Sequence, residues 1–171
     1  MTYNQFEFIG LQNYEKIADK LFLMIEQVFG FKDEYYQQAV EEAVCNAGRY
    51  SVYGPEQAKI LINIRVAAYD IAVTIISKTH PFDALAYQKK LRSLANDTRY
   101  ADMDWGDYVG LTTASSGFWY MLTGVDYLFI DSIGQSITLS KNTLRRAEMN
   151  VSTKISMLVP RFFVRDNGVI I

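Results

Sequence analysis

The residues best suited to chemistry in this sequence are Glu42 and Asn46, which lie in the stretch 35–50. Apolar residues in this stretch recur at the i, i+3, i+4 and i+7 spacing of a buried helical face, and they are Val40, Ala43, Val44 and Ala47. Because Glu42 and Asn46 are one helical turn apart, their side chains should leave the same side of this helix. A carboxylate that can act as a base would then lie beside an amide oxygen that can bind a hard cation. On spacing alone, the same pair also fits an ordinary solvated helix.

The composition of the chain limits the kinds of protein it can be. With 171 residues, half of them apolar, it is long enough for one domain with a substantial core. The net charge of −2 provides no basic field, so we expect neither a nucleic acid nor a membrane surface as a partner. Cys45 is the only cysteine, which excludes an internal disulfide and a cysteine-based zinc site. No apolar run reaches a membrane span of about 18 residues and no signal-like segment appears, so we expect a cytoplasmic protein.

The hydrophobic patterning predicts an alternation of short strands and helices. Alternating residues predict strands at 6–8, 60–66 and 71–75, and a final hairpin at 127–130 and 137–141. Helical spacing predicts helices at 13–30, 35–50 and 85–96, with a short helix from Gly117. Residues 97–116 show no period, and 155–159 are strand-like. Adjacent hairpins with helices gathered on one face predict an α+β two-layer α/β sandwich.

The segment Glu42-Ala-Val-Cys-Asn46-Ala47 resembles the N-box of the histidine-kinase-like (GHKL, Bergerat-fold) ATPases, most closely the anti-sigma-factor serine kinase branch. The resemblance covers residues 6–141 and implies a mixed, mostly antiparallel sheet. In that family the N-box glutamate activates a nucleophile near the γ-phosphate and the asparagine binds Mg²⁺. The resemblance therefore implies ATP and Mg²⁺ as cofactors, Glu42 as the catalytic base and Asn46 as the metal ligand.

Two further segments resemble the glycine boxes that hold the nucleotide, and both depart from the family pattern. Ser77 stands where an aspartate accepts a hydrogen bond from adenine, and losing such a charge-assisted acceptor typically costs about 1.5 to 3 kcal/mol. At Gly117 the backbone could hold a phosphate, or the serines before it could simply cap the helix. The implied nucleotide-binding positions are Asn46, Arg49, Ser77, Thr79, Phe82, Ser115, Ser116, Gly117, Phe118 and Gln135.

Two functions follow from this resemblance and its departures. The first is a regulatory ATP-binding protein with an altered site which, if active, would be an ATP-dependent serine/threonine protein kinase. The alternative is a non-catalytic protein-binding module that kept the fold and lost ATP binding. The family implies a homodimer and a protein partner such as a sigma factor or an anti-anti-sigma-type regulator. We expect residues 1–141 to form the domain, with a lid at about 83–116, and residues 142–171 to add a strand or dock a partner.

Overall fold

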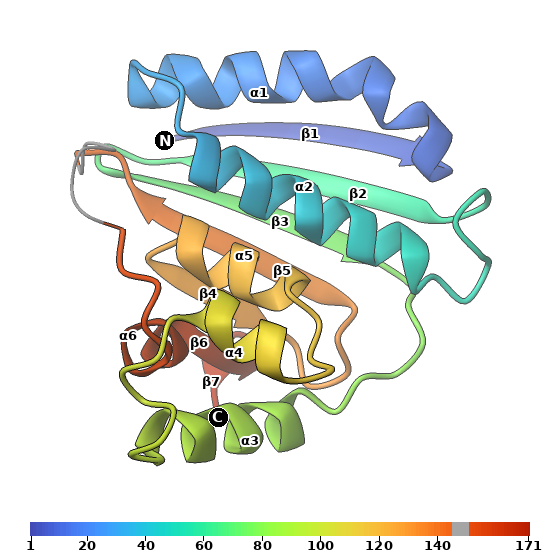
Figure 1. The fold of residues 1–171 in the computed structure, drawn as a ribbon. Helices are drawn as coiled ribbons and strands as arrows, with labels where there is room; N and C mark the ends of the chain where they lie inside the picture. Colours follow the sequence, from blue (N-terminus) through green and yellow to red (C-terminus); the bar gives the residue numbers. More distant parts are fainter. Residues whose placement is uncertain (145–150) are drawn as a thin grey trace.

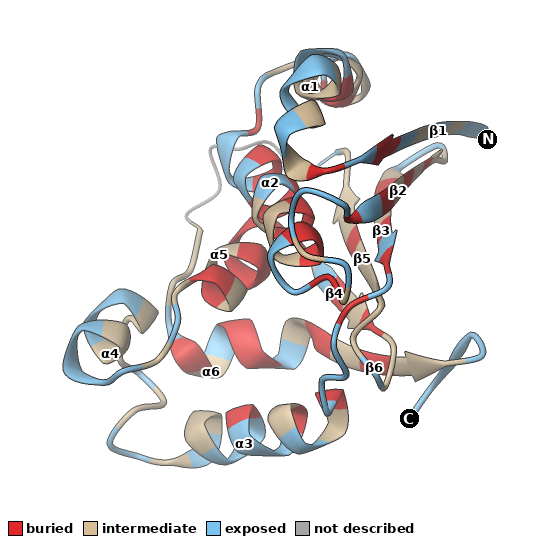
Figure 2. Ribbon diagram, turned by 90° about the vertical axis from the view of Figure 1, so that its right-hand side faces the viewer, coloured by how far each residue is buried: buried red, intermediate tan, exposed pale blue. Residues whose placement is uncertain are grey.

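The computed structural model describes residues 1–144 and 151–171, and in this part of the chain seven strands form one sheet with the helices on one of its faces (Figures 1 and 2). The strands are β1 (Thr2–Ile9), β2 (Lys59–Val66), β3 (Asp70–Ser77), β4 (Tyr127–Ile130), β5 (Ser136–Asn142), β6 (Phe162–Asp166) and β7 (Val169–Ile170). The helices are α1 (Glu15–Phe29), α2 (Glu34–Arg49), α3 (Ala84–Asn96), α4 (Trp105–Leu111), α5 (Gly117–Gly124) and α6 (Ile155–Leu158), with 3-10 turns η1 (Leu11–Asn13) and η2 (Val159–Arg161).

The sheet is mixed and mostly antiparallel, as the sequence predicts. Its strand order is β1-β2-β3-β5-β4-β6-β7, and the pair β4–β6 is parallel. The hairpin predicted from the alternating isoleucines is present, since Asn63 pairs with Thr74 across β2 and β3. Thr74 in turn pairs with Thr138 of β5. The predicted α+β two-layer sandwich is therefore confirmed.

The core lies between the sheet and helix α2, and the two periodicities of the sequence build it. Every second residue of β2 and β3 is buried toward the helices: Ile60, Ile62, Ile64, Ile71, Val73 and Ile75. The apolar stripe of α2 is buried against them: Val40, Ala43, Val44 and Ala47. Each large aliphatic side chain buried in this way contributes about 1.5 to 3 kcal/mol to folding. This packing fixes which face of α2 is left for other contacts.

The start of α2 is anchored to strand β5. Asp33 caps the helix, as its position predicts, because its Oδ1 accepts a hydrogen bond of 3.0 Å from the Tyr36 amide. Its Oδ2 lies 2.6 Å from Lys141 Nζ, an ion pair that lacks the geometry of a directed hydrogen bond. The Tyr36 hydroxyl also donates to the Leu139 carbonyl at 3.0 Å. These contacts hold the helix that carries Glu42 and Asn46 at a fixed angle to the sheet.

Two sequence-based predictions about the second half of the chain are wrong. The stretch 97–116, expected to be without regular structure, contains helix α4, whose N-cap is Asp104. The stretch 155–159, expected to be strand-like, forms α6 and enters η2, because Ile155 and Leu158 are buried on one helical face. The strand comes later, as β6, where Phe162 and Val164 alternate into the core.

The segment between β3 and α5 is bound to the C-terminal segment. The amides of Trp105, Ile155 and Ser156 donate to the carbonyls of Thr153, Met103 and Ala101, respectively. In addition, Gln88 Nε2 donates to the Phe162 carbonyl at 3.1 Å from a buried position. The expected lid is therefore fastened to the expected C-terminal extension along much of its length. Residues 145–150 of that extension lie outside the described residues.

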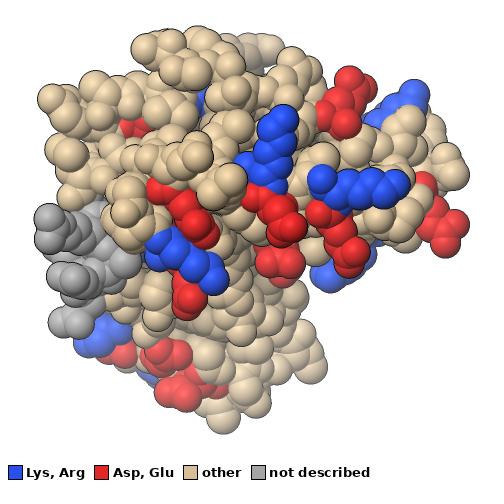
Figure 3. Space-filling view, turned by 90° about the horizontal axis from the view of Figure 1, so that it is seen from above, with Lys and Arg blue, Asp and Glu red and all other residues tan. Residues whose placement is uncertain are grey.

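The surface carries both signs of charge. In the view of Figure 3, Lys and Arg side chains are interspersed with Asp and Glu and do not form a patch of one sign. No helix in the two described ranges is long and apolar enough to cross a membrane.

Candidate functional site

Glu42 lies against the first residue of helix α5. A Cβ atom added to Gly117 would be 2.1 Å from Glu42 Oε1 and 2.9 Å from its Cδ, so the carboxylate occupies the space that any larger residue would need. At the other end of α5, a Cβ on Gly124 would be 2.2 Å from the Tyr35 carbonyl oxygen. Two glycines thus allow α5 to lie directly on α2. The Glu42 carboxylate is therefore in contact with the N-terminal residue of α5.

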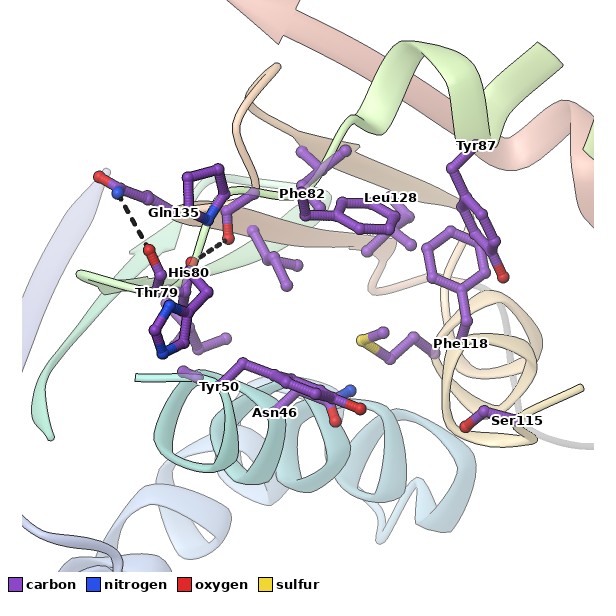
Figure 4. Close-up of a pocket in the computed structure, with 17 residues that line it drawn as sticks. Asn46, Tyr50, Thr79, His80, Phe82, Tyr87, Ser115, Phe118, Leu128 and Gln135 are labelled. Carbon is purple, nitrogen blue, oxygen red and sulfur yellow. Dashed lines mark hydrogen bonds between the residues drawn. The ribbon is translucent and has the colours of Figure 1, made fainter. Parts of the chain in front are cut away.

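A cavity of about 390 Å³ opens beside this contact, between α2, the chain after β3, α5 and the β4–β5 turn (Figure 4). Its volume is within the range of small-molecule sites. Its wall is predominantly apolar, and the lining residues are Asn46, Ala47, Tyr50, Ile75, Thr79, His80, Pro81, Phe82, Tyr87, Ser115, Phe118, Met121, Leu128, Ile130, Gly134, Gln135 and Ile137. Asn46 therefore faces a concave site rather than bulk solvent.

Aromatic rings form one side of the cavity. Tyr87 meets Phe82 edge-to-face at 5.3 Å between ring centroids and Phe118 at 4.9 Å. Phe118 in turn meets Phe162 of β6 at 4.9 Å. Burial, with a smaller effect of Tyr108, raises the pKa of Tyr87 to about 12, so its hydroxyl is neutral near pH 7. This wall suits a flat, apolar ligand surface such as a nucleobase.

Most polar groups at the end of β3 form hydrogen bonds with main-chain carbonyls. Thr79 Oγ1 donates to the Gly134 carbonyl at 3.1 Å, and Gln135 Nε2 donates to the Thr79 carbonyl at 3.3 Å (Figure 4). The Ser77 amide donates to the Gln135 carbonyl at 3.0 Å. Ser77 Oγ, by contrast, is buried without a hydrogen-bond partner among the described residues. Ser77 is on the same face of β3 as Ile75, which lines the cavity, but Ser77 is not itself a lining residue.

Gly134 is required by the turn that closes this side. Its φ of +77° lies in the left-handed region, and a Cβ would be 2.8 Å from Phe82 Cβ. Because only glycine permits both this turn and this close approach, it sets the position of Phe82 in the aromatic wall.

Helix α2 contributes Asn46 to the cavity, and Arg49 lies beside it. Arg49 Nη1 donates to Asn46 Oδ1 across 3.4 Å, and Arg49 is exposed. Asn46 Oδ1 fits the part of a single protein ligand to Mg²⁺, which usually keeps water and phosphate oxygens as its other ligands. Among residues 1–144 and 151–171, no group of three or more His, Cys, Asp or Glu side chains is arranged to hold a metal ion.

The structure brings most of the predicted site residues together. Six line the cavity: Asn46, Thr79, Phe82, Ser115, Phe118 and Gln135. The others do not line it: Glu42 lies on Gly117, Ser116 is the N-cap residue of α5, Arg49 bonds to Asn46, and Ser77 has a buried hydroxyl.

Sequence reasoning missed several lining residues. His80, Tyr50 and Tyr87 line the cavity but are not among the predicted site residues. The inward positions of β4 and β5 also contribute Leu128, Ile130 and Ile137. Strand alternation could have identified these three, because they share the buried face of the sheet. Tyr87 carries no such signal, since its role depends on where α3 packs.

Kinship with the histidine-kinase-like ATPases stays a prediction from the sequence. The chain matches no family model and no curated protein sequence.

Proposed function

We propose that the chain is a regulatory ATP-binding protein whose function is similar to that of anti-sigma-factor serine kinases. The observation that carries this proposal is the position of Asn46, which lines a cavity one helical turn from a carboxylate that lies on Gly117. The resemblance implies this pairing of an amide oxygen, a base and a helix N-terminus around one concave site.

In this proposal each part of the cavity has a separate task. The aromatic wall of Phe82, Tyr87 and Phe118 holds the base, and Asn46 Oδ1 binds the Mg²⁺ that accompanies the phosphates. The amides at the start of α5 would bind the phosphate groups, with the Gly117 amide giving up its 3.4 Å hydrogen bond to Ser115 Oγ. Since Arg49 is exposed and its contact with Asn46 is long, it is free to turn toward an anion. ATP binding would then control a protein partner such as a sigma factor or an anti-anti-sigma-type regulator, in a cytoplasmic homodimer.

Catalysis is a separate part of the proposal and depends on Glu42. A positioned general base contributes about 10²- to 10⁴-fold to a rate. We therefore expect Glu42→Gln to lower phosphate transfer or ATP hydrolysis by about this factor while nucleotide affinity changes little. Equal hydrolysis rates in both proteins would remove Glu42 from the mechanism.

A second candidate function is a non-catalytic protein-binding module that does not use ATP. The observation that favours it concerns the polar groups near the end of β3, where the nucleobase would lie. The side chains of Thr79 and Gln135 already donate hydrogen bonds to main-chain carbonyls there. Lys and Arg are also absent from the described lining residues. Such a cavity would hold an uncharged ligand more readily than a triphosphate.

Titration with a fluorescent ATP analogue in the presence of Mg²⁺ separates the two candidates. We expect saturable binding that unlabelled ATP displaces, and at least about a tenfold loss of affinity in Asn46→Ala, since a ligand to a charged group is removed. Asn96→Ala is the matched control, because Asn96 is exposed at the end of α3. Binding that Asn46→Ala leaves unchanged would contradict the proposed site, and absence of binding would favour the second candidate.

A further inference from the structure

The helices leave the opposite face of the sheet uncovered (Figure 2). This face carries a second hollow. It is a groove of about 290 Å³ that crosses the strands from β1 to β6. Its lining includes Tyr3, Asn63, Thr74, Thr138, Phe129 and Arg165. These residues alternate along the strands with those of the cavity, since Thr74, Phe129 and Thr138 are the neighbours of Ile75, Leu128 and Ile137. The groove is therefore separated from the cavity by the thickness of the sheet.

Arg165 is the unusual residue of this groove. Its guanidinium carbon lies 3.9 Å from the centroid of the Phe129 ring, which fixes the orientation of the planar group. Its Nε is buried and has no hydrogen-bond acceptor in the described part of the chain. The side chain as a whole is only partly buried and lines the groove, so a ligand there can bring an acceptor to the guanidinium. The other arginine of the groove, Arg65, is paired with Asp70.

The groove therefore contains one positive charge that no described carboxylate compensates. Around it are neutral hydrogen-bonding groups, including the Thr74 and Thr138 hydroxyls, which share a hydrogen bond of 2.9 Å. One uncompensated positive charge matches a single carboxylate better than a phosphate dianion. A carboxylate also has two oxygens spaced for a bidentate contact with a guanidinium.

The rim of the groove is apolar and exposed. Phe163 stacks on Phe129 at 5.5 Å between centroids, and Tyr127, about half exposed, lies 6.0 Å from Phe163. On the same face, Tyr3 and Ile76 are also exposed. Exposed aromatic residues around a fixed arginine are typical of the central part of protein interfaces.

We infer that this groove binds an acidic side chain of a partner protein, with its carboxylate on Arg165 and an adjacent aromatic or aliphatic side chain on Tyr127 and Phe163. The site is independent of the proposed function, because none of its lining residues faces the cavity.

The test uses the full chain labelled with ¹⁵N and follows the Nε–Hε signal of Arg165, which Arg165→Lys identifies by its loss. The probe is the tripeptide acetyl-Phe-Glu-Phe-amide, and its neutral counterpart carries Gln in place of Glu. We expect the acidic peptide to shift the Arg165 signal saturably and to bind at least about tenfold more tightly than the neutral one. Arg165→Gln should lower the affinity for the acidic peptide about tenfold, which is measured from shifts of backbone amide signals. The control variant Arg92→Gln, at an exposed position of α3, should leave this affinity unchanged.

Three results would overturn the inference. Equal binding of the acidic and neutral peptides in the wild-type protein would remove the role of the charge, and this comparison holds even if a variant fails to fold. Tighter binding of inorganic phosphate than of the acidic peptide would assign the site to phosphate. A shift of the Arg165 signal with protein concentration alone, abolished by Glu7→Gln on the same face, would show that a second copy of the chain occupies the groove.

Discussion

Helix α5 contains two glycines that contact α2, and substituting each of them with alanine should have different consequences. At Gly124 the new Cβ would be 2.2 Å from the Tyr35 carbonyl oxygen and 2.7 Å from Ala39 Cβ. The Tyr35 carbonyl and Ala39 Cβ are both fixed to helix α2, so the new Cβ can fit only if α5 moves away from α2. Overpacking of this kind costs about 1 to 3 kcal/mol. For a chain of this size, each 1 kcal/mol lowers the melting temperature by about 2 to 4 °C.

At Gly117 the obstacle is the end of a flexible side chain. Moving the Glu42 carboxylate off its preferred rotamer costs about 0.5 to 1.5 kcal/mol. Replacing a helical glycine by alanine returns about 0.4 to 1 kcal/mol through the unfolded state. The two effects nearly cancel, so we expect Gly117→Ala to change stability by less than about 1 kcal/mol while it displaces Glu42 from the site.

Urea denaturation of a double-mutant cycle tests this reasoning. In the Glu42→Ala background the obstacle is gone, so Gly117→Ala should become stabilising by about 0.4 to 1 kcal/mol. Gly124→Ala should remain destabilising in the same background and is the matched control. If Gly124→Ala proved as well tolerated as Gly117→Ala, or if Glu42→Ala did not change the effect of Gly117→Ala, the proposed α2–α5 contact would be wrong.

Three further predictions concern other parts of the molecule. Asp33→Asn should keep the helix cap but leave Lys141 unpaired, and breaking such a buried pair costs about 3 to 5 kcal/mol in urea denaturation; a stability equal to wild type would show that the pair contributes nothing. Burial raises the pKa of Tyr87 from 10.0 to about 12, so its contribution to stability is complete below pH 10 and is lost as the pH rises toward 12. The melting temperature should therefore fall less between pH 10 and 12 in Tyr87→Phe than in the wild type. An equal fall in both proteins would contradict the burial effect. Ser77→Asp should lower the stability of the free protein and raise its affinity for ATP about tenfold, because it restores a charged acceptor. Weaker ATP binding by this variant would show that the adenine of ATP does not lie near Ser77.

Local patterns predicted most of the fold because local and tertiary preferences agree there. The stripe of α2 and the alternation of β2 and β3 are buried as expected, since one face of each element meets the same core. The prediction failed at 155–159, where Ile155 and Leu158 also fit a helical spacing and a short apolar run does not distinguish the two structures. It failed again at α4, a short helix whose aromatic residues pack on other elements, such as Trp105 on Tyr120.

Only the part of the candidate site that lies within one turn of α2 could be predicted from the sequence. The direction of Glu42 and Asn46 follows from their spacing on α2, and the structure places both beside α5. The aromatic wall could not be derived in this way, because Tyr87, Phe118 and Phe162 come from three elements that meet only in the folded chain. The sequence also gives no signal that the Ser77 hydroxyl is buried without a partner among the described residues.

Calorimetric titration of the unlabelled protein with Mg-ATP, Mg-ADP and adenosine will show whether the cavity beside Asn46 binds an adenine nucleotide. We predict saturable heat with both nucleotides, weaker binding of adenosine, and competition among the three for one site. Absence of heat at millimolar nucleotide, or binding of ATP that adenosine does not displace, would contradict it.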